Sequence, residues 1–321
     1  MGCAVKNKKT LGEQLTIVVN SCDAYEDLWT PFFVLLKKYW NPTECQILLN
    51  TESRTFSFPG LNIECVHTGK NVAYGKRMLN MLARVKTKYI LLLLDDFFLR
   101  SKVEQSRIEQ ILEWMEADRN IVCFNCDPNV CYADWEVNKY PGFRRMPPGN
   151  SYVLSLQAAI WRTDRLKKYW RPDVNPWEWE ELCSIQTARY PKEKFYCLNK
   201  ADDTFLDYGH RRYGGIWGVY RGKWVVDDVG PLFEKEEINV DYSVRGTYTS
   251  DERRPAISVS DDRKSRYSCV ARCLGKREVF RYFVFCRCCN IMRRMGKAVN
   301  YDYFRFLQNR VKRKFLNSFE V

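Results

Sequence analysis

Residues 89–99 read YILLLLDDFFL, a short apolar run that ends in two adjacent carboxylates. Charged residues flank the run, and its length is typical of a strand that is buried on both faces of a sheet. The carboxyl ends of such strands are where open α/β sheets bind ligands. Asp95 and Asp96 repel each other unless a cation holds them, and carboxylate oxygens suit Mg²⁺ or Mn²⁺. A strand-to-loop junction with two solvated acids is the alternative interpretation.

The segments around this run alternate between strand and helix patterns. Apolar runs predict strands over 15–20, 46–50, 62–66, 121–124 and 152–161. Apolar residues at helical spacing predict helices over 26–40, 74–85, 101–117 and 163–170, the last with Thr163 as its N-cap. The chain has neither a G-x-G-x-x-G turn nor a P-loop lysine, which argues against a Rossmann dehydrogenase and a P-loop kinase. The order of elements predicts an α/β fold.

The charge of the chain is concentrated in one region. The 321 residues carry a net charge of +13, and 16 Lys and Arg against three acids lie between Arg263 and Val321. The rest of the chain is therefore balanced, which argues against nucleic acid as a partner and favours a basic attachment element. We predict a catalytic domain over 1–241, a polar linker over 242–266 and a basic helical extension over 267–321.

Cysteine content and targeting signals indicate the compartment. The chain has 14 Cys, but its first ten residues are polar and basic, and no stretch approaches 18 apolar residues. These features predict reduced thiols in a cytoplasmic protein, which the basic extension would attach peripherally to the inner face of the membrane. Aromatic and basic residues alternate in the extension, as in helices that bind anionic membrane surfaces; a helical lid on the body is the alternative.

Four segments come in an order that resembles GT-A-fold glycosyltransferases, specifically bacterial family 2-like enzymes of surface polysaccharide synthesis. They are 15–20, Asp95-Asp96, 155–161 and 175–180, and the resemblance covers roughly residues 13–240. It implies a GT-A-type nucleotide-sugar-binding mixed sheet flanked by helices. It also implies that a sugar passes, with inversion, from a nucleotide-diphosphate donor to a hydroxyl of a glycan or lipid-linked acceptor.

The resemblance assigns the donor site to the loop after the first strand. There Asn20, Ser21 and Asp23 would cradle the base and ribose, although an Asx-turn is an alternative use of Asp23. Arg77, at the start of a predicted helix, would contact the diphosphate or the base. A solvated basic face is the alternative for Arg77.

The metal site would centre on the two acids of the opening run. Asp96 is predicted to bind Mn²⁺ or Mg²⁺, and Asp95 to bind ribose or to support the metal through water. The family motif is often D-x-D, whereas Phe97 occupies the third position here, so metal dependence stays open. His210 is a candidate further metal ligand, with a surface role as the alternative.

Acidic residues near the predicted helix start at Asn175 match the acceptor-side motif of the family. Glu178 stands at the third helical position, where a Glu caps the helix, so it is the less favoured catalyst. Glu180 shares a helix face with Trp177 and is predicted to be the general base that deprotonates the acceptor hydroxyl. The alternative is an acidic helix start that the helix dipole favours.

Two other classes of function remain open from the sequence. One is a nucleotidyl- or phosphotransferase on a related α/β sheet, although residues 20–25 lack the glycine and base expected of a triphosphate loop. The other is a non-enzymatic basic protein that binds a membrane or nucleic acid, whose affinity would survive the loss of Asp96.

Overall fold

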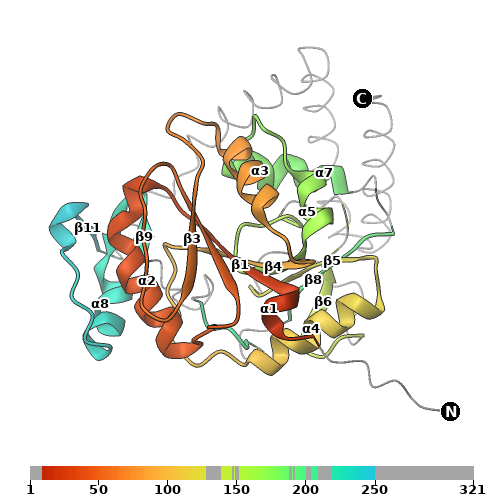
Figure 1. Ribbon diagram of the computed structural model, residues 1–321, viewed down its shortest axis with the longest axis horizontal. Helices are drawn as coiled ribbons and strands as arrows, with labels where there is room; N and C mark the ends of the chain where they lie inside the picture. Colours follow the sequence, from red (N-terminus) through yellow and green to blue (C-terminus); the bar gives the residue numbers. More distant parts are fainter. Residues whose placement is uncertain are drawn as a thin grey trace, which may run out of the picture.

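The computed structural model describes residues 9–127, 139–146, 148, 152–187, 190, 192–199, 204–208 and 218–249. In this part of the chain, helices cover both faces of an eight-stranded mixed sheet (Figure 1), which confirms the predicted fold class. The strand order is β3-β2-β1-β4-β7-β5-β8-β6, in which β7 runs antiparallel to β4 and β5, and β6 antiparallel to β8. The strands are β1 (Leu15–Asn20), β2 (Gln46–Thr51), β3 (Asn62–His67), β4 (Tyr89–Leu94), β5 (Ile121–Asn125), β6 (Phe143–Met146), β7 (Ala159–Arg162) and β8 (Lys194–Leu198).

The helices pack on the sheet in two groups. Buried side chains of α2 (Glu26–Tyr39) and α4 (Gln105–Ala117) belong to the core on one face, together with the short α1 (Leu11–Gln14). Buried side chains of α3 (Tyr74–Arg84) and α5 (Thr163–Tyr169) belong to the core on the other face. Near the second group lie α6 (Pro176–Glu178), the π-helix η2 (Trp179–Cys183) and α7 (Ser184–Gln186).

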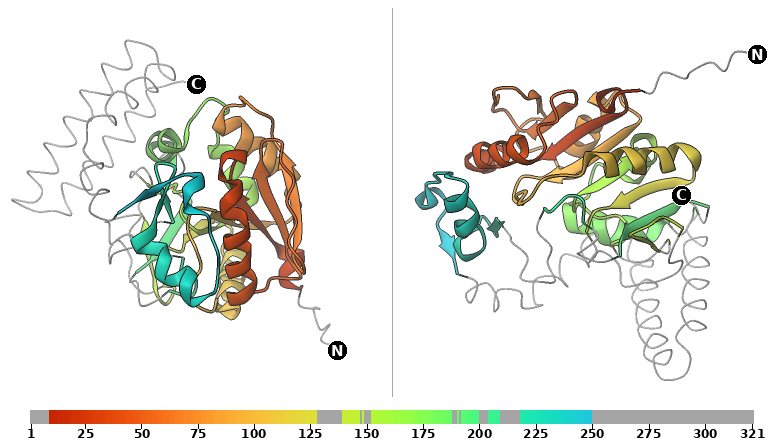
Figure 2. Two further views of the ribbon diagram at one scale, coloured as in Figure 1. Left: turned by 90° about the vertical axis from the view of Figure 1, so that its left-hand side faces the viewer. Right: turned by 90° about the horizontal axis from the view of Figure 1, so that it is seen from below.

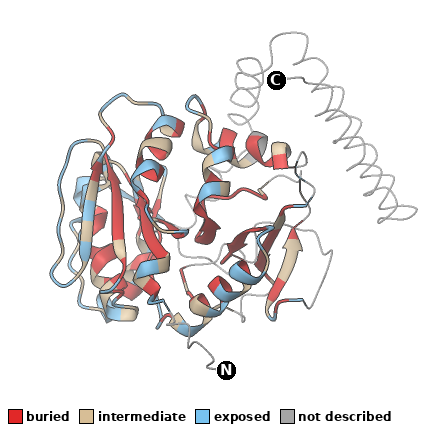
Figure 3. Cartoon of the chain, turned by 45° about the vertical axis from the view of Figure 1, so that its right-hand side comes forward, coloured by how far each residue is buried: buried red, intermediate tan, exposed pale blue. Residues whose placement is uncertain are grey.

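The opening run of the sequence forms the centre of the sheet. β4 pairs in parallel with β1 and antiparallel with β7. Its side chains alternate between the two cores, with Leu91 and Leu93 in one and Ile90 and Leu92 in the other. In Figure 3 the central strands of the sheet have the colour of buried residues. Burial of one such side chain contributes about 2 kcal/mol to the free energy of unfolding. The prediction that this run forms a strand buried on both faces is therefore confirmed.

A second, three-stranded sheet lies at the end of the described chain. It pairs β9 (Val219–Tyr220), β10 (Lys223–Val225) and β11 (Thr247–Tyr248), and α8 (Val226–Lys235) and the 3₁₀ turn η6 (Tyr242–Val244) connect them. α8 lies beside α2 (Figure 2), where Tyr39 donates a hydrogen bond to Glu236 at 2.7 Å. The predicted linker is described as far as Thr249, and β11 pairs with β10 in this stretch.

Three sequence predictions differ from the observed elements. The strand predicted over 152–161 is reduced to β7, because Leu154 N–H donates to the Ser184 hydroxyl instead of a neighbouring strand. The helix predicted from residue 101 begins at Gln105. Thr163 is the first residue of α5 rather than its N-cap, and its hydroxyl donates to the Thr87 carbonyl.

Two further expectations concern the same described ranges. Within them, no helix combines the length and the apolar character that a membrane span requires. The seven cysteines among these residues are all free thiols. The predicted basic extension over 267–321 lies outside the described residues.

Candidate functional site

The carboxyl edge of the central strands brings the predicted donor-site residues together. Asn20 at the end of β1 is in register with Leu94 at the end of β4 and with Asn50 in β2. The chain therefore leaves all three strands at one edge of the sheet. Because β7 is antiparallel, residues 155–158, which precede it, reach the same edge.

Asp95 is a buried carboxyl that is held by the loop after β1. The Ser21 hydroxyl donates a hydrogen bond to Asp95 Oδ2 and accepts one from Trp29 Nε1 at 2.6 Å. Burial, followed by the charge of Asp96, raises the pKa of Asp95 well above its ordinary value. A carboxyl in this setting fixes the loop to the end of β4.

Asp96 lies among three tyrosines. Burial, followed by the negative charge of Asp96, raises the pKa of Tyr25 to about 12 and also raises the pKa of Tyr208. The pKa of Tyr74 is raised as well, and the charge of Asp96 is one of the causes. Tyr208 fixes the preceding backbone, because its phenol hydrogen-bonds both the N–H and the carbonyl of Leu94. The carbonyl of Asp96 itself accepts a hydrogen bond from Gly218 N–H at 2.9 Å.

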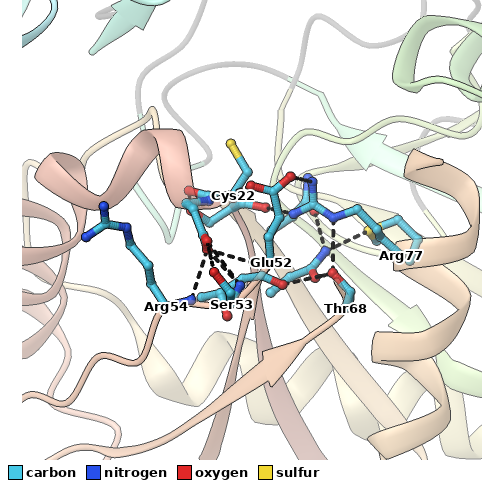
Figure 4. Close-up of polar contacts among 12 residues, drawn as sticks. Cys22, Glu52, Ser53, Arg54, Thr68 and Arg77 are labelled. Atoms are coloured by element: carbon cyan, nitrogen blue, oxygen red, sulfur yellow. Dashed lines mark hydrogen bonds and ion pairs between the residues drawn. The ribbon is translucent and has the colours of Figure 1, made fainter. Parts of the chain in front are cut away.

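Arg77 joins the loops that follow the first three strands. Its guanidinium donates to the Ser21 carbonyl at 2.7 Å, to the Thr68 hydroxyl at 3.1 Å and to Glu52 at 3.4 Å (Figure 4). Only 8% of Arg77 is exposed, so the alternative of a solvated basic face is wrong. The Arg77 side chain therefore binds the backbone of the candidate donor loop and does not extend into solvent.

Asp23 has a similar linking role. Its Oδ1 accepts hydrogen bonds from the amides of Glu52, Ser53 and Arg54 at 2.9–3.2 Å, and its Oδ2 accepts one from the Ser53 hydroxyl at 2.6 Å (Figure 4). Partial burial opposes ionisation, but the hydrogen bonds from Ser53 and these amides prevail and lower the pKa of Asp23. Asp23 therefore fastens the loop after β1 to the loop after β2.

The two candidate catalytic acids have different surroundings. Glu178 completes a capping box with Asn175, with both backbone-to-side-chain distances at 2.9 Å, and is buried. Glu180 Oε1 instead accepts hydrogen bonds from Leu156 N–H at 2.9 Å and from the Ser155 hydroxyl at 3.2 Å. The predicted helix is a single turn followed by the π-helix η2, which carries Glu180. Trp177, in that single turn, is 65% exposed.

Tyr74 connects Glu180 to the donor loop. Asn20 Nδ2 donates to the Tyr74 phenol at 2.7 Å, and the charge of Glu180 is the second cause, after burial, that raises the pKa of Tyr74. The ring of Tyr74 packs on Trp170, which in turn stacks on Trp179 at 4.3 Å, immediately before Glu180. The predicted donor-side and acceptor-side residues are thus neighbours.

Tyr25, Tyr74 and Tyr208 are candidate site residues that sequence reasoning missed. Tyr74 stands three positions before Arg77, and Tyr25 follows Asp23 by two positions, so both are close to residues that were predicted for the donor site. Loops at strand ends converge on ligands, so phenols in these loops were a usable signal. Tyr208 lies far along the chain from Leu94, and nothing local in the sequence indicates that contact.

The donor atoms for a metal are few among the described residues. No group of three or more His, Cys, Asp or Glu side chains that could hold a metal is present there. Asp95 is committed to Ser21, whereas the repulsion between Asp96 and Asp95 is of the kind that a divalent cation relieves. A divalent cation at Asp96 would need further ligands, for which phosphate oxygens of a substrate are suitable. His210 lies outside the described residues.

Comparison with known proteins gives distant structural likenesses. No family model matches the chain, and no curated protein does. Residues 1–349 of S. aureus TarS in complex with UDP-GlcNAc are 13% identical with a TM-score of 0.43, and the match covers 95% of this chain and 91% of that one. The match to another structure of S. aureus TarS covers 59% of this chain and only 37% of that one, at 13% identity and a TM-score of 0.39. A UDP-glucose pyrophosphorylase complexed with UDP-glucose is 10% identical with a TM-score of 0.37, over 58% of this chain and 90% of that one.

Proposed function

We propose that this protein is a glycosyltransferase that moves a sugar from a nucleotide-diphosphate donor to a hydroxyl of an acceptor. The proposal rests chiefly on one observation: Tyr74 hydrogen-bonds Asn20 at the end of β1, and its ring packs on Trp170, which stacks on Trp179 of the π-helix that carries Glu180. β1 ends in register with β4, which the two acids follow. This observation supports a site that combines a polar loop, a carboxylate pair and a separate carboxylate. A transferase of this class needs one group for each of its tasks, namely donor binding, diphosphate stabilisation and activation of the acceptor.

The donor is proposed to bind at the loop after β1. Asn20 and Ser21 offer polar side chains at the strand end, close to the acids. Arg77 and Asp23 hold this loop against the loops after β2 and β3 through hydrogen bonds of 3.4 Å or less. We therefore assign Arg77 and Asp23 to shaping the donor site, a change from the direct contacts predicted for them.

Asp96 is the proposed ligand for Mn²⁺ or Mg²⁺. When bound, the ion would neutralise charge that builds up on the leaving diphosphate. Asp95, buried against Ser21, keeps the neighbouring backbone in place for Asp96. His210 remains a predicted further ligand.

Glu180 is the proposed general base. Two hydrogen bonds to Oε1 fix the orientation of its carboxylate. In the reaction, the acceptor hydroxyl gives its proton to Glu180 while its oxygen bonds to the anomeric carbon. The bond from that carbon to the diphosphate oxygen breaks, so the nucleoside diphosphate leaves and the configuration inverts.

The acceptor is proposed to be a glycan or a lipid-linked glycan. Trp177 supports this, because an exposed aromatic side chain three residues before the proposed base can stack on a sugar ring. The basic residues between Arg263 and Val321 would hold the enzyme on an anionic membrane surface, at the cytoplasmic face. Such a location would bring it to a lipid-linked acceptor.

A pair of isosteric substitutions tests the assignment of the base. Glu180→Gln should lower the rate of sugar transfer about 10²- to 10⁴-fold, because it removes the proton acceptor, and should leave donor affinity unchanged. Glu178→Gln should keep most of the activity, since Gln also completes a capping box. Equal loss in both variants, or full activity of Glu180→Gln, would contradict the assignment.

A further inference from the structure

Arg245 occupies a nearly buried position that connects the end of the described chain to the candidate donor loop. Its guanidinium donates to Asp27 Oδ2 at 2.8 Å, also pairs with Asp27 Oδ1, and donates to the Ala24 carbonyl at 2.8 Å and the Gly222 carbonyl at 3.1 Å. Only 8% of its side chain is exposed. One residue therefore joins the first turn of α2, the loop before it and the β9–β10 turn.

The same guanidinium packs on two aromatic rings. Its central carbon lies 4.7 Å from the centre of the Tyr25 ring and 5.9 Å from that of Trp224. Trp224 is fully buried in the core, so it gives the guanidinium a rigid support. Tyr25 ends the 3₁₀ turn η1 (Asp23–Tyr25), and its phenol is close enough to Asp95 and Asp96 for both charges to act on it.

A second contact links residues 218–249, which include Arg245, to the backbone of Asp96. Gly218 N–H donates to the Asp96 carbonyl, and Val225 N–H donates to the Gly218 carbonyl. A Cβ atom at Gly218 would lie 2.1 Å from the Phe98 ring and 2.6 Å from the Asp96 carbonyl, so only glycine allows this approach. Residues 218–249 thus contact the acids through Gly218 and the donor loop through Arg245.

We propose that Arg245 is a positioning residue for the donor site: it fixes Ala24, Tyr25 and the start of α2, and thereby holds the loop after β1 in the shape that accepts the nucleotide. The donor part of this inference rests on the proposed function. Lysine cannot replace the residue, because the planar guanidinium supplies its donors in a fixed fork on several sides at once, whereas an ammonium is a single point charge.

The first test needs no nucleotide. Hydrogen exchange of the backbone amides is measured in the full chain for the wild type, Arg245→Met, Asp27→Asn and the control Arg84→Met, which changes an exposed arginine at the end of α3. We expect exchange over residues 22–27 to be at least about tenfold faster in both Arg245→Met and Asp27→Asn, with β4 unchanged. Asp27→Asn keeps the shape of the pair, so it covers the case in which Arg245→Met fails to fold.

The second test uses UDP, GDP and CDP as probes. Arg245→Met should weaken binding of the preferred nucleotide about 10- to 100-fold, because the loop is misplaced rather than the ligand contacts removed. Arg245→Lys should restore only part of this affinity, and Arg245→Met combined with Asp27→Asn should be no worse than Arg245→Met alone. In a transfer assay the loss should appear in the KM of the donor more than in kcat.

Two results would overturn the inference. Unchanged exchange over residues 22–27 would show that Arg245 does not hold the loop, and faster exchange spread equally over β4 would reduce its role to general stability. If the wild type binds none of the three nucleotides, the proposed function fails and the donor part of the inference fails with it. The exchange data distinguish failure of the proposed function from failure of the role of Arg245. In the former case, exchange over residues 22–27 is faster in Arg245→Met although no nucleotide binds the wild type.

Discussion

Residues of the same type have different roles here because their hydrogen-bond partners differ. Asp23 is saturated by amides and a hydroxyl of the neighbouring loop, whereas Asp96 lies among tyrosines at the end of β4. Glu178 caps the helix start at Asn175, whereas Glu180 faces residues 155 and 156. Acids of one type are therefore held by different partners, and for Glu178 the capping role that the sequence predicts is confirmed.

The exposure of Trp177 leads to a prediction about acceptor binding. Because its side chain is 65% exposed, Trp177→Ala should leave the thermal midpoint of unfolding within about 1–2 °C of the wild type. It should raise the KM of a glycan acceptor about tenfold through the loss of stacking, without changing donor affinity. Parallel kinetics with varied donor and varied acceptor check this, with Trp177→Phe as the variant that keeps an aromatic face. A rise in donor KM alone would contradict the role.

At the scale of elements, one ionic contact fastens α8 to α2. Glu236 directly follows α8. It forms an ion pair with Lys38 and accepts a hydrogen bond from Tyr39, and these two residues lie at the end of α2. The hydrogen bond from Lys38, followed by that from Tyr39, lowers the pKa of Glu236 from 4.5 to about 2. The folded state therefore binds a proton at Glu236 less readily than the unfolded state does.

This contact predicts a defined dependence of stability on pH. The contribution of Glu236 is complete above pH 4.5 and is lost as the pH falls from 4.5 to about 2. The difference in free energy of unfolding between wild type and Glu236→Gln should therefore be largest near neutral pH and should shrink over that window. Urea unfolding at pH 7, 4 and 3 measures it. A difference that grows as the pH falls would contradict the account.

The sequence predicts elements well where the pattern is local and poorly where a distant partner decides. The run at 89–94 could be assigned because a short, uninterrupted apolar stretch between charged flanks is typical of a strand buried on both faces. Residues 152–158 could not be assigned correctly, because the amides of Leu154 and Leu156 donate to side chains of α7 and η2 instead of to a neighbouring strand. Asp27 and Arg245 stand 218 positions apart, so no local pattern announces their contact.

At the scale of the whole molecule, a balanced body is combined with a strongly basic end. Since 16 Lys and Arg against three acids lie between Arg263 and Val321, we predict that this region attaches the enzyme to anionic lipid. The full chain should bind vesicles that contain phosphatidylserine, bind phosphatidylcholine vesicles weakly, and dissociate at high salt. Co-sedimentation at two salt concentrations measures this.

A triple variant sharpens the membrane prediction. Replacing Lys312, Arg313 and Lys314 by alanine should weaken vesicle binding roughly 100-fold, at about 1 kcal/mol per basic residue near the surface. Transfer to a water-soluble acceptor should remain unchanged, because none of the three is among the residues to which the proposed function assigns a role in the site. Equal binding to neutral and anionic vesicles would contradict an electrostatic attachment.

The most direct test of the central claim is calorimetric titration of the full chain with UDP, GDP and CDP, with and without Mn²⁺. The wild type, Asp96→Ala and the surface control Asp164→Ala, which changes a side chain that is 72% exposed, should be compared. We expect that one nucleotide binds the wild type and the control with micromolar affinity, that binding requires Mn²⁺, and that Asp96→Ala abolishes it. Binding that is independent of Mn²⁺ and of Asp96 would contradict the metal role, and the absence of binding under every condition would contradict the glycosyltransferase itself.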